Sequence, residues 1–198
     1  MTHFPAAYID ADARAPTSPR GTYTLFFYGT LVHPAILSKI IGHAGSTLSI
    51  QPAILPRHEL HHVVGQDYPA LLTLERSESV AAEGKHLGAV RGTVVRGLGP
   101  EDVRRLDAFE GDEYVRVRVR IVPDPESPAL ANDVRPRDAL AGVLAKLDPA
   151  RVKALLACGD DGEEEAQAYL WRAPLDLLEA RVWDFAEFAN SGRTARWV

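Results

Sequence analysis

The segment His58-Glu59-Leu60-His61-His62 satisfies the pattern HExxH, whose residue types could bind zinc. On a helix, this spacing would put two histidine ligands on one face, with Glu59 as the general base of a metalloprotease. A proline lies two residues before the segment, and two β-branched valines and a glycine follow it. In a strand, Glu59 would face away from His58 and His62. We therefore expect extended structure and no metal site, with a zinc metalloprotease as a remote alternative.

Other familiar catalytic patterns are weak or missing in this chain. Cys158 is the only cysteine, with no histidine close in sequence, and no serine lies in a GxSxG pattern. The pair Gly97 and Gly99 has no third glycine, so it indicates a turn and not a nucleotide-binding loop. No protein nucleophile is assigned.

Three separated segments carry the stronger signal: Tyr28-Gly29-Thr30-Leu31, Tyr68-Pro69-Ala70-Leu71, and Leu106 to Gly111 followed by Tyr114-Val115-Arg116. In the first, a strand ends in a glycine turn that leads into a helix. Backbone N–H groups at such a turn can bind a carboxylate or a developing oxyanion. An ordinary strand-to-helix connection explains the same residues.

Glu110 is the carboxylate with the most unusual predicted surroundings. It stands at the end of an apolar-faced helix, where the helix dipole disfavours negative charge. Partial burial beside Phe109 would raise its pKa further, toward the range of a general base. A surface position in a polar turn is the alternative. Its neighbours Asp107, Asp112 and Glu113 are expected to be solvated.

The elements that must position these residues follow from local patterns. Strands are predicted over 22–28, 48–60, 68–74, 89–97, 114–122 and 166–171, with a polar loop over 75–88. Helices are predicted from Pro34 to Gly42 and over 101–110, as one or two short pieces within 137–157, and over 175–189. Arg116, Arg118 and Arg120 share one face of the strand at 114–122, which predicts a solvated sheet face, with a groove for an acidic ligand as the alternative. The irregular alternation indicates an α+β fold.

Composition limits the classes of function. The chain has 198 residues and a net charge of −5, which disfavours a nucleic-acid binder. It has no apolar run long enough to span a membrane. Residues 1–20 are expected to be a flexible tail without a secretory signal, and 21–198 a single domain. One cysteine is compatible with a reducing compartment, and a cytoplasmic location is expected.

In this order the YGTL, YPAL, LDAFEGDEY and AYLW segments (the last at 168–171) resemble the gamma-glutamylcyclotransferase-like family, which includes gamma-glutamylamine cyclotransferases and plant avirulence-induced proteins. The resemblance implies a small mixed β-barrel with flanking helices. It also implies an enzyme that converts a gamma-glutamyl amide or amino acid to 5-oxoproline and a free amine, without a cofactor.

By this resemblance Glu110 is the general acid/base, and the substrate-binding residues are Tyr28, Gly29, Thr30, Leu31, Tyr68 and Tyr114. The expected partner is a small gamma-glutamyl molecule, bound by a monomer or weak homodimer. Residues 123–165 depart from the family pattern and are expected to be an insertion. A non-catalytic small-molecule-binding module on the same fold is the alternative.

Overall fold

The computed structural model describes residues 7–80, 88–126, 148–157 and 162–183. The strands are β1 (Tyr8–Ile9), β2 (Tyr23–Phe27), β3 (Ser49–Pro56), β4 (His58–Val63), β5 (Pro69–Thr73), β6 (Ala89–Leu98), β7 (Tyr114–Pro123), β8 (Glu164–Trp171) and β9 (Leu178–Val182). The α-helices are α1 (Pro34–Ile41), α2 (Leu74–Ser77), α3 (Pro100–Glu110) and α5 (Pro149–Ala157). Four 3-10 turns join them: η1 (Ala11–Arg14), η2 (Gly29–Val32), η3 (Glu78–Val80) and η5 (Leu175–Leu177).

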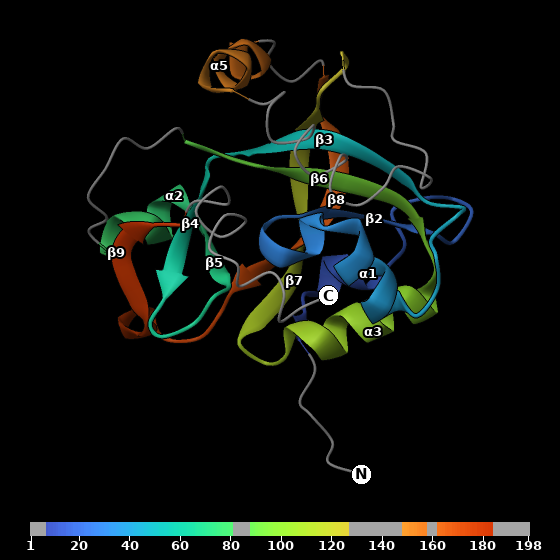
Figure 1. The fold of residues 1–198 in the computed structure, drawn as a ribbon, viewed down its shortest axis with the longest axis horizontal. Coiled ribbons are helices and arrows are strands. Elements are labelled where there is room, and N and C mark those ends of the chain that lie inside the picture. The colour runs from blue at the N-terminus through green and yellow to red at the C-terminus, as the bar shows by residue number, and fades with distance from the viewer. Residues whose placement is uncertain (1–6, 81–87, 127–147, 158–161, 184–198) are drawn as a thin grey trace.

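Five strands close into a barrel in the order β7-β3-β6-β2-β8, because β8 also pairs with β7. The β2–β8 pair is parallel and the other barrel pairs are antiparallel, so the sheet is mixed. The short strand β1 extends the barrel by pairing in parallel with β7. Figure 1 shows α1 and α3 covering one side of this barrel and α5 beyond its opposite end. The α+β fold with a small mixed barrel and flanking helices is therefore as predicted.

Strand β2 is buried on both of its faces. Phe26 belongs to one apolar cluster with Val94 and Val119, whereas Leu25 and Phe27 belong to a second cluster. The second cluster also contains residues of both covering helices: Ile36, Leu37, Ile41, Val103 and Leu106. Because both faces are covered, the strand has a nearly continuous apolar sequence instead of an alternating one.

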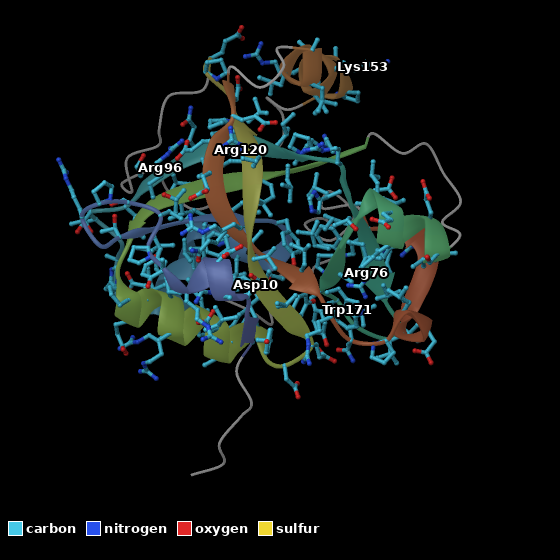
Figure 2. All side chains as sticks on the ribbon, turned by 180° about the vertical axis from the view of Figure 1, so that it is seen from behind. Asp10, Arg76, Arg96, Arg120, Lys153 and Trp171 are labelled. Carbon is cyan, nitrogen blue, oxygen red and sulfur yellow. The ribbon has the colours of Figure 1, made fainter. Side chains whose placement is uncertain are left out.

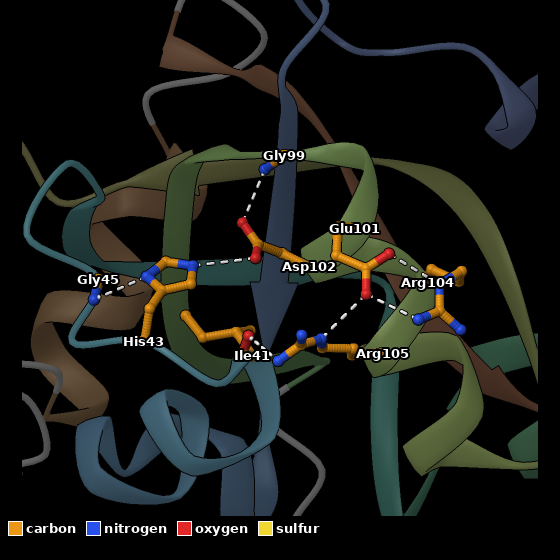
Figure 3. Close-up of polar contacts among 8 residues, drawn as sticks. All are labelled: Ile41, His43, Gly45, Gly99, Glu101, Asp102, Arg104 and Arg105. Atoms are coloured by element: carbon orange, nitrogen blue, oxygen red, sulfur yellow. Dashed lines mark hydrogen bonds and ion pairs between the residues drawn. The ribbon is translucent and has the colours of Figure 1, made fainter.

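Polar contacts fix the start of α3 against the end of α1, as Figure 3 shows. The Asp102 carboxylate accepts the Gly99 backbone N–H at 2.8 Å, and its other oxygen lies 2.9 Å from Nε2 of His43. Arg105 donates to the carbonyl of Ile41 at 2.8 Å. These contacts orient α3, the helix whose last residue is Glu110.

A second, smaller sheet, in the order β5-β4-β9, lies beside the barrel with α2 (Figure 1). Arg76 of α2 donates to the carbonyl of Trp171, the last residue of β8, at 2.5 Å, and Figure 2 shows the two residues close together. Leu60 and Leu71 of the small sheet join the same apolar cluster as Phe26. The two sheets therefore share a core.

The prediction of a helix over 175–189 is wrong for the described part of that segment, residues 175–183. A 3-10 turn is followed by strand β9, whose Leu178 and Val182 pair with Val63 and His61 of β4. A spacing of four residues fits one face of a helix but also one face of a strand. The segment forms a strand because it pairs with the edge of β4. Residues 184–189 lie outside the described residues.

The polar loop predicted over 75–88 also contains regular structure. Thr73 caps α2 by accepting the Arg76 backbone N–H at 3.4 Å, and η3 follows. The threonine was a local signal for a helix start that the sequence analysis did not use. Residues 81–87 lie outside the described residues.

The flexible-tail prediction is wrong for residues 7–20. The backbone N–H of Ala7 donates to Asp107 O at 2.7 Å, and that of Asp10 donates to Arg116 O at 3.0 Å. Ala13 is fully buried. The composition of this segment is typical of a tail. The segment is nevertheless ordered, because β7 supplies hydrogen-bond partners for its backbone and Ala13 is buried.

The remaining element predictions are confirmed for the described residues, with boundaries shifted by up to three residues, except that Arg57 divides the predicted strand over 48–60 into β3 and β4. Within 123–165 the structure describes the end of β7, α5 and the start of β8; residues 127–147 and 158–161, with Cys158, lie outside the described residues. That this stretch is an insertion stays a prediction. Among the described residues, no helix is long and apolar enough to span a membrane.

Candidate functional site

A cavity of about 270 Å³ lies where β2, β5 and β7 begin or end beside the end of α3. Its lining comes from all three segments that the sequence analysis singled out: Tyr28, Thr30, Tyr68, Pro69, Phe109, Glu110, Glu113 and Tyr114. Segments some 80 residues apart in sequence therefore meet at one concave surface, to which Tyr28, Thr30 and Glu110 all contribute side chains.

Gly29 allows the first two segments to approach each other. It follows β2 with φ of +67°, a left-handed conformation that L side chains rarely adopt. A Cβ atom at this position would lie 2.9 Å from the ring carbons of Pro69, closer than packed atoms tolerate. The glycine both turns the chain into η2 and gives Pro69 room to line the cavity.

Three tyrosine hydroxyls tie the cavity walls together. Tyr114 donates to the Pro69 carbonyl at 2.9 Å, which joins the start of β7 to the start of β5. Tyr68 donates to the Glu113 carboxylate at 3.2 Å, and Tyr28 donates to the carbonyl of Tyr169 in β8. Because each hydroxyl gives its proton to the protein, its oxygen remains able to accept a hydrogen bond from a ligand.

Glu110 is positioned by the way α3 ends. Gly111, with φ of +71°, stops the helix, and its N–H donates to Asp107 O at 3.3 Å. The half-buried Glu110 side chain lines the cavity, and no hydrogen bond or ion pair from the described residues reaches its carboxylate. Burial, and then the negative charge of Asp107, raises its pKa to about 8. Glu110 can therefore gain or lose a proton near neutral pH.

Asp107 is buried, so the prediction that it is solvated is wrong. The Arg116 guanidinium donates to both carboxylate oxygens of Asp107, at 2.7 and 3.1 Å, and the Tyr169 hydroxyl donates to Asp107 at 2.8 Å. Arg116 also donates to the Ala13 carbonyl at 2.7 Å and to the side chain of Gln167. Asp107 falls on the same helix face as Val103 and Leu106, and this periodicity was the signal that could have identified it.

The tyrosines of the site stay protonated over the physiological pH range. Burial, and then the charge of Glu110, raises the pKa of Tyr28 well above its usual value. Burial, and then the nearby Tyr28 and Glu110, does the same for the pKa of Tyr114. Burial, and then the Glu113 carboxylate, raises the pKa of Tyr68 to about 12. We infer that these phenols act as neutral hydrogen-bonding groups.

Two residues proposed to bind substrate do not line the cavity. Gly29 acts through the backbone turn described above, and Leu31 is buried in the apolar core. Conversely, Pro69, Phe109 and Glu113 line the cavity although the sequence analysis gave none of them a role there. Glu113 was expected to be solvated, but it is half-buried at the cavity wall. The roles of all these residues in binding or catalysis remain predictions.

The HELHH segment forms strand β4, as predicted. Side chains four residues apart in a strand are separated by about 13 Å, too far for His58 and His62 to share one metal ion. Ser77 instead joins the other two polar side chains: its Oγ lies 2.5 Å from Oε2 of Glu59 and 2.8 Å from Nε2 of His61. The part of the chain that the structure describes contains no group of three or more His, Cys, Asp or Glu side chains that could hold a metal ion.

The arginines of β7 do not form one uniform face. Arg116 is buried and forms an ion pair with Asp107. Neither the predicted solvated face nor the alternative groove for an acidic ligand accounts for this position. Arg118 pairs with Glu165, and Arg120 pairs with Glu163 at 2.9 Å on the more exposed half of the strand. In the pairing of β7 with β8, Glu165 lies opposite Arg120 and diagonal to Arg118, and Glu163 lies just before the first residue of β8.

Comparison with known proteins identifies the family. The profile described as "Gamma-glutamyl cyclotransferase, AIG2-like" matches residues 25–146, more than half of the chain. The Arabidopsis thaliana proteins named Protein AIG2 C and AIG2-like protein A are 28% and 29% identical over 51% and 55% of this chain. The chain spans about half the length of these relatives, 53% and 58% respectively.

A solution structure of an Arabidopsis thaliana protein superposes with a TM-score of 0.51, at 20% identity. The match covers 91% of this chain and 89% of the other. This likeness shows a shared fold.

Proposed function

Because the chain belongs to the gamma-glutamyl cyclotransferase, AIG2-like family, we propose that it converts a gamma-glutamyl amide or amino acid to 5-oxoproline and a free amine, with Glu110 as the general acid/base. One observation carries the proposal: a carboxylate with a pKa of about 8, and with no hydrogen-bonding partner among the described residues, faces a cavity whose other walls supply hydroxyl and backbone groups. This is the pKa range in which a carboxylate accepts and returns a proton efficiently near neutral pH.

The reaction uses the α-amine of the substrate as nucleophile. Glu110 takes a proton from the α-ammonium group, and the amine nitrogen attacks the γ-carbonyl carbon, forming the C–N bond of a five-membered ring. The bond to the departing nitrogen then breaks as the proton held by Glu110 passes to that nitrogen. The ring nitrogen releases its second proton to water, which leaves a neutral lactam, and the free amine takes up a proton from water. Holding the amine beside the carbonyl makes the attack intramolecular, and no cofactor takes part in these steps.

Hydrogen-bond donors at the start of η2 fit the remaining charges of this substrate. The first N–H groups of a helix, here those of Gly29 and Thr30, have no partner within the helix. Of the two residues Thr30 lines the cavity, so its N–H is the donor proposed to receive the substrate carboxylate or the tetrahedral oxyanion. Thr30 adds a side-chain hydroxyl to the cavity, and no hydrogen bond to it is made within the described residues. The oxygens of Tyr28 and Tyr114 can accept from the substrate ammonium group.

The test is a panel of gamma-glutamyl amides, amino acids and peptides, with release of 5-oxoproline measured for the wild type and for Glu110→Gln. The amide keeps the shape of the side chain but cannot accept the proton, so we expect turnover to fall by roughly 10²–10⁴-fold. Glu101→Gln is the matched control, because Glu101 is exposed on the same helix and pairs only with Arg104 and Arg105 among the described residues.

Retained turnover in Glu110→Gln would remove this residue from the mechanism. Tight binding of a gamma-glutamyl compound without turnover by the wild type would support a non-catalytic binding module in place of an enzyme.

A further inference from the structure

A groove of about 400 Å³ lies beside the N-terminal strand, and none of its lining residues lines the cavity at Glu110. Its walls come from β1, the end of η1, the turn after α3 and the residue that follows β8: Ala7, Tyr8, Ile9, Arg14, Asp112 and Arg172. Small-molecule sites have volumes of roughly 300–1,000 Å³, so the groove is large enough for a small ligand. The reaction proposed for Glu110 gives it no role.

The charged side chains of the groove have not paired with each other. Arg14, Asp112 and Arg172 are exposed, and none of the three forms a side-chain hydrogen bond or an ion pair with a described residue. The exposed arginines of β7 differ in this respect, because Arg118 and Arg120 each pair with a glutamate. The groove therefore offers two positive charges and one negative charge to a ligand.

Arg172 is held at two points. Its guanidinium carbon lies 5.1 Å from the centre of the Tyr8 ring, a cation–π contact. Its backbone N–H donates to Glu113 O at 2.8 Å. A guanidinium group has five N–H donors, so Arg172 can stay over the ring and still donate to a carboxylate. Tyr8 is 54% exposed and adds apolar surface for the carbon chain of a ligand.

The backbone of the wall that carries Arg14 is also fixed. The Arg14 carbonyl accepts the Tyr23 hydroxyl at 3.3 Å, and the preceding carbonyl, of Ala13, accepts the Arg116 guanidinium at 2.7 Å. The backbone N–H of Asp10 donates to Arg116 O at 3.0 Å. A ligand would thus meet walls whose backbone is already ordered, which lowers the entropy cost of binding.

The charges of the groove define the class of ligand. Each guanidinium can bind a carboxylate, and Asp112 can bind an ammonium group. A polyphosphate or nucleic acid is disfavoured by Asp112 and by the net charge of −5. A simple dicarboxylate would leave Asp112 without a partner, and a neutral amino acid would leave one guanidinium without a carboxylate. A ligand with two carboxylates and one ammonium group matches all three side chains.

We propose that the groove is a second binding site, for a free acidic amino acid whose carboxylates bind Arg14 and Arg172 and whose ammonium group binds Asp112. Tyr8 positions the Arg172 guanidinium and packs against the carbon chain of the ligand. Binding here involves no bond making or breaking. It does not depend on the reaction proposed for Glu110.

The experiment is calorimetric titration of the full chain with L-aspartate and L-glutamate at low ionic strength. Succinate and glutarate are the analogues that lack the ammonium group, and L-2-aminobutanoate lacks the second carboxylate. At least one acidic amino acid should bind about tenfold more tightly than these analogues, which corresponds to about 1.4 kcal/mol. Added salt should weaken binding, because the groove is open to solvent. Absence of binding by both acidic amino acids would overturn the inference, as would equal affinity for the analogues.

Variants locate the ligand. Arg14→Gln, Asp112→Asn and Arg172→Gln should each weaken binding by about tenfold, while circular dichroism shows an unchanged fold, because all three side chains are exposed. Tyr8→Ala should also weaken binding, whereas Tyr8→Phe keeps the ring and should retain it. Arg104→Gln is the matched control, since Arg104 is 70% exposed and lies outside the groove. Unchanged affinity in the three groove variants would refute the site.

A further variant separates the groove from the cavity described above. Glu110→Gln should bind the acidic amino acid as tightly as the wild type does, since Glu110 does not line the groove. Loss of binding in Glu110→Gln, with binding retained in Arg172→Gln, would place the ligand in the other cavity and contradict the proposal. No readout here uses release of 5-oxoproline, so failure of the proposed function would leave these results interpretable.

Discussion

At the scale of single residues, the proposed chemistry depends on two carboxylates three positions apart on one helix. Asp107 is fully engaged by Arg116 and Tyr169, whereas Glu110 has no hydrogen-bonding partner among the described residues. On the same helix, Asp107 is held by an ion pair and hydrogen bonds, whereas the pKa of Glu110 is raised by burial and by the negative charge of Asp107. An environment that raises the pKa of a carboxyl group toward neutrality is a recurrent means of making a general acid or base.

This difference predicts the pH dependence of the reaction. Glu110 must be deprotonated to act as a base, so kcat/KM should rise with pH and level off above an apparent pKa of about 8. Initial rates between pH 5 and pH 9 measure this, with circular dichroism at each pH to show that the fold is intact. A rate that is flat from pH 6 to 9, or that falls over this range, contradicts the assignment.

The free energy of unfolding offers an independent check of the same pKa. The folded state binds the Glu110 proton more tightly than the unfolded chain, where the pKa is near 4.5. The resulting stability is fully present below the unfolded pKa and is lost as the pH rises through about 8. The wild type should therefore lose stability relative to Glu110→Gln between these two pH values.

At the scale of elements, the site depends on turns that place the end of one element against the start of another. The Gly29 turn lets β2 meet Pro69 of β5, and the Gly111 turn lets α3 end at Glu110 before β7 begins. Gly29 has both a left-handed backbone conformation and a close approach to Pro69, which is distant in sequence. The turn and the packing can therefore be tested together.

Gly29→Ala and Gly65→Ala form a matched pair. Both glycines have positive φ, +67° and +72°, so each alanine should cost roughly 1–2 kcal/mol of backbone strain. A Cβ at Gly65 would meet nothing within 4 Å, whereas at Gly29 it would press on Pro69. Urea unfolding should therefore show a larger loss for Gly29→Ala, together with reduced substrate binding. Equal losses would show that contact with Pro69 does not constrain the turn.

At the scale of the whole molecule, Arg116 connects parts that are distant in sequence. It contacts α3 through Asp107, β8 through Gln167, and the N-terminal segment through Ala13. Backbone bonds from Ala7 and Asp10 strengthen the same junction. The support beneath Glu110 is thus assembled from both ends of the described chain.

Replacing Arg116 should consequently destabilise the whole fold. Arg116→Met leaves Asp107 buried without its ion pair, and breaking a buried pair in this way costs roughly 3–5 kcal/mol. Arg120→Met is the control from the same strand: Arg120 is 55% exposed, and such a surface pair contributes about 0–1 kcal/mol. Thermal and urea unfolding measure both variants. Similar losses in the two would contradict the central role of Arg116.

The sequence by itself determined those features whose causes are local. Pro100 and Gly111 bound α3, Pro34 opens α1, and the flanks of HELHH make it a strand, because these depend on backbone chemistry within a few residues. The ordered motifs, through their resemblance to a known family, also indicated the barrel. They brought Tyr28, Thr30 and Glu110 into one hypothesis before any geometry was known.

Tertiary structure alone decided the features that depend on a distant partner. The spacing of Leu178 and Val182 is compatible with one face of a helix or one face of a strand. Pairing with the edge of β4 favours the strand. Asp107 is polar, and its burial depends on the hydrogen bonds that Arg116 and Tyr169 donate to it. Residues 7–20 have the composition of a tail and are ordered by the edge of β7. In each case the residue's own chemistry permits two states, and the free energy that separates them comes from contacts formed only when the chain has folded.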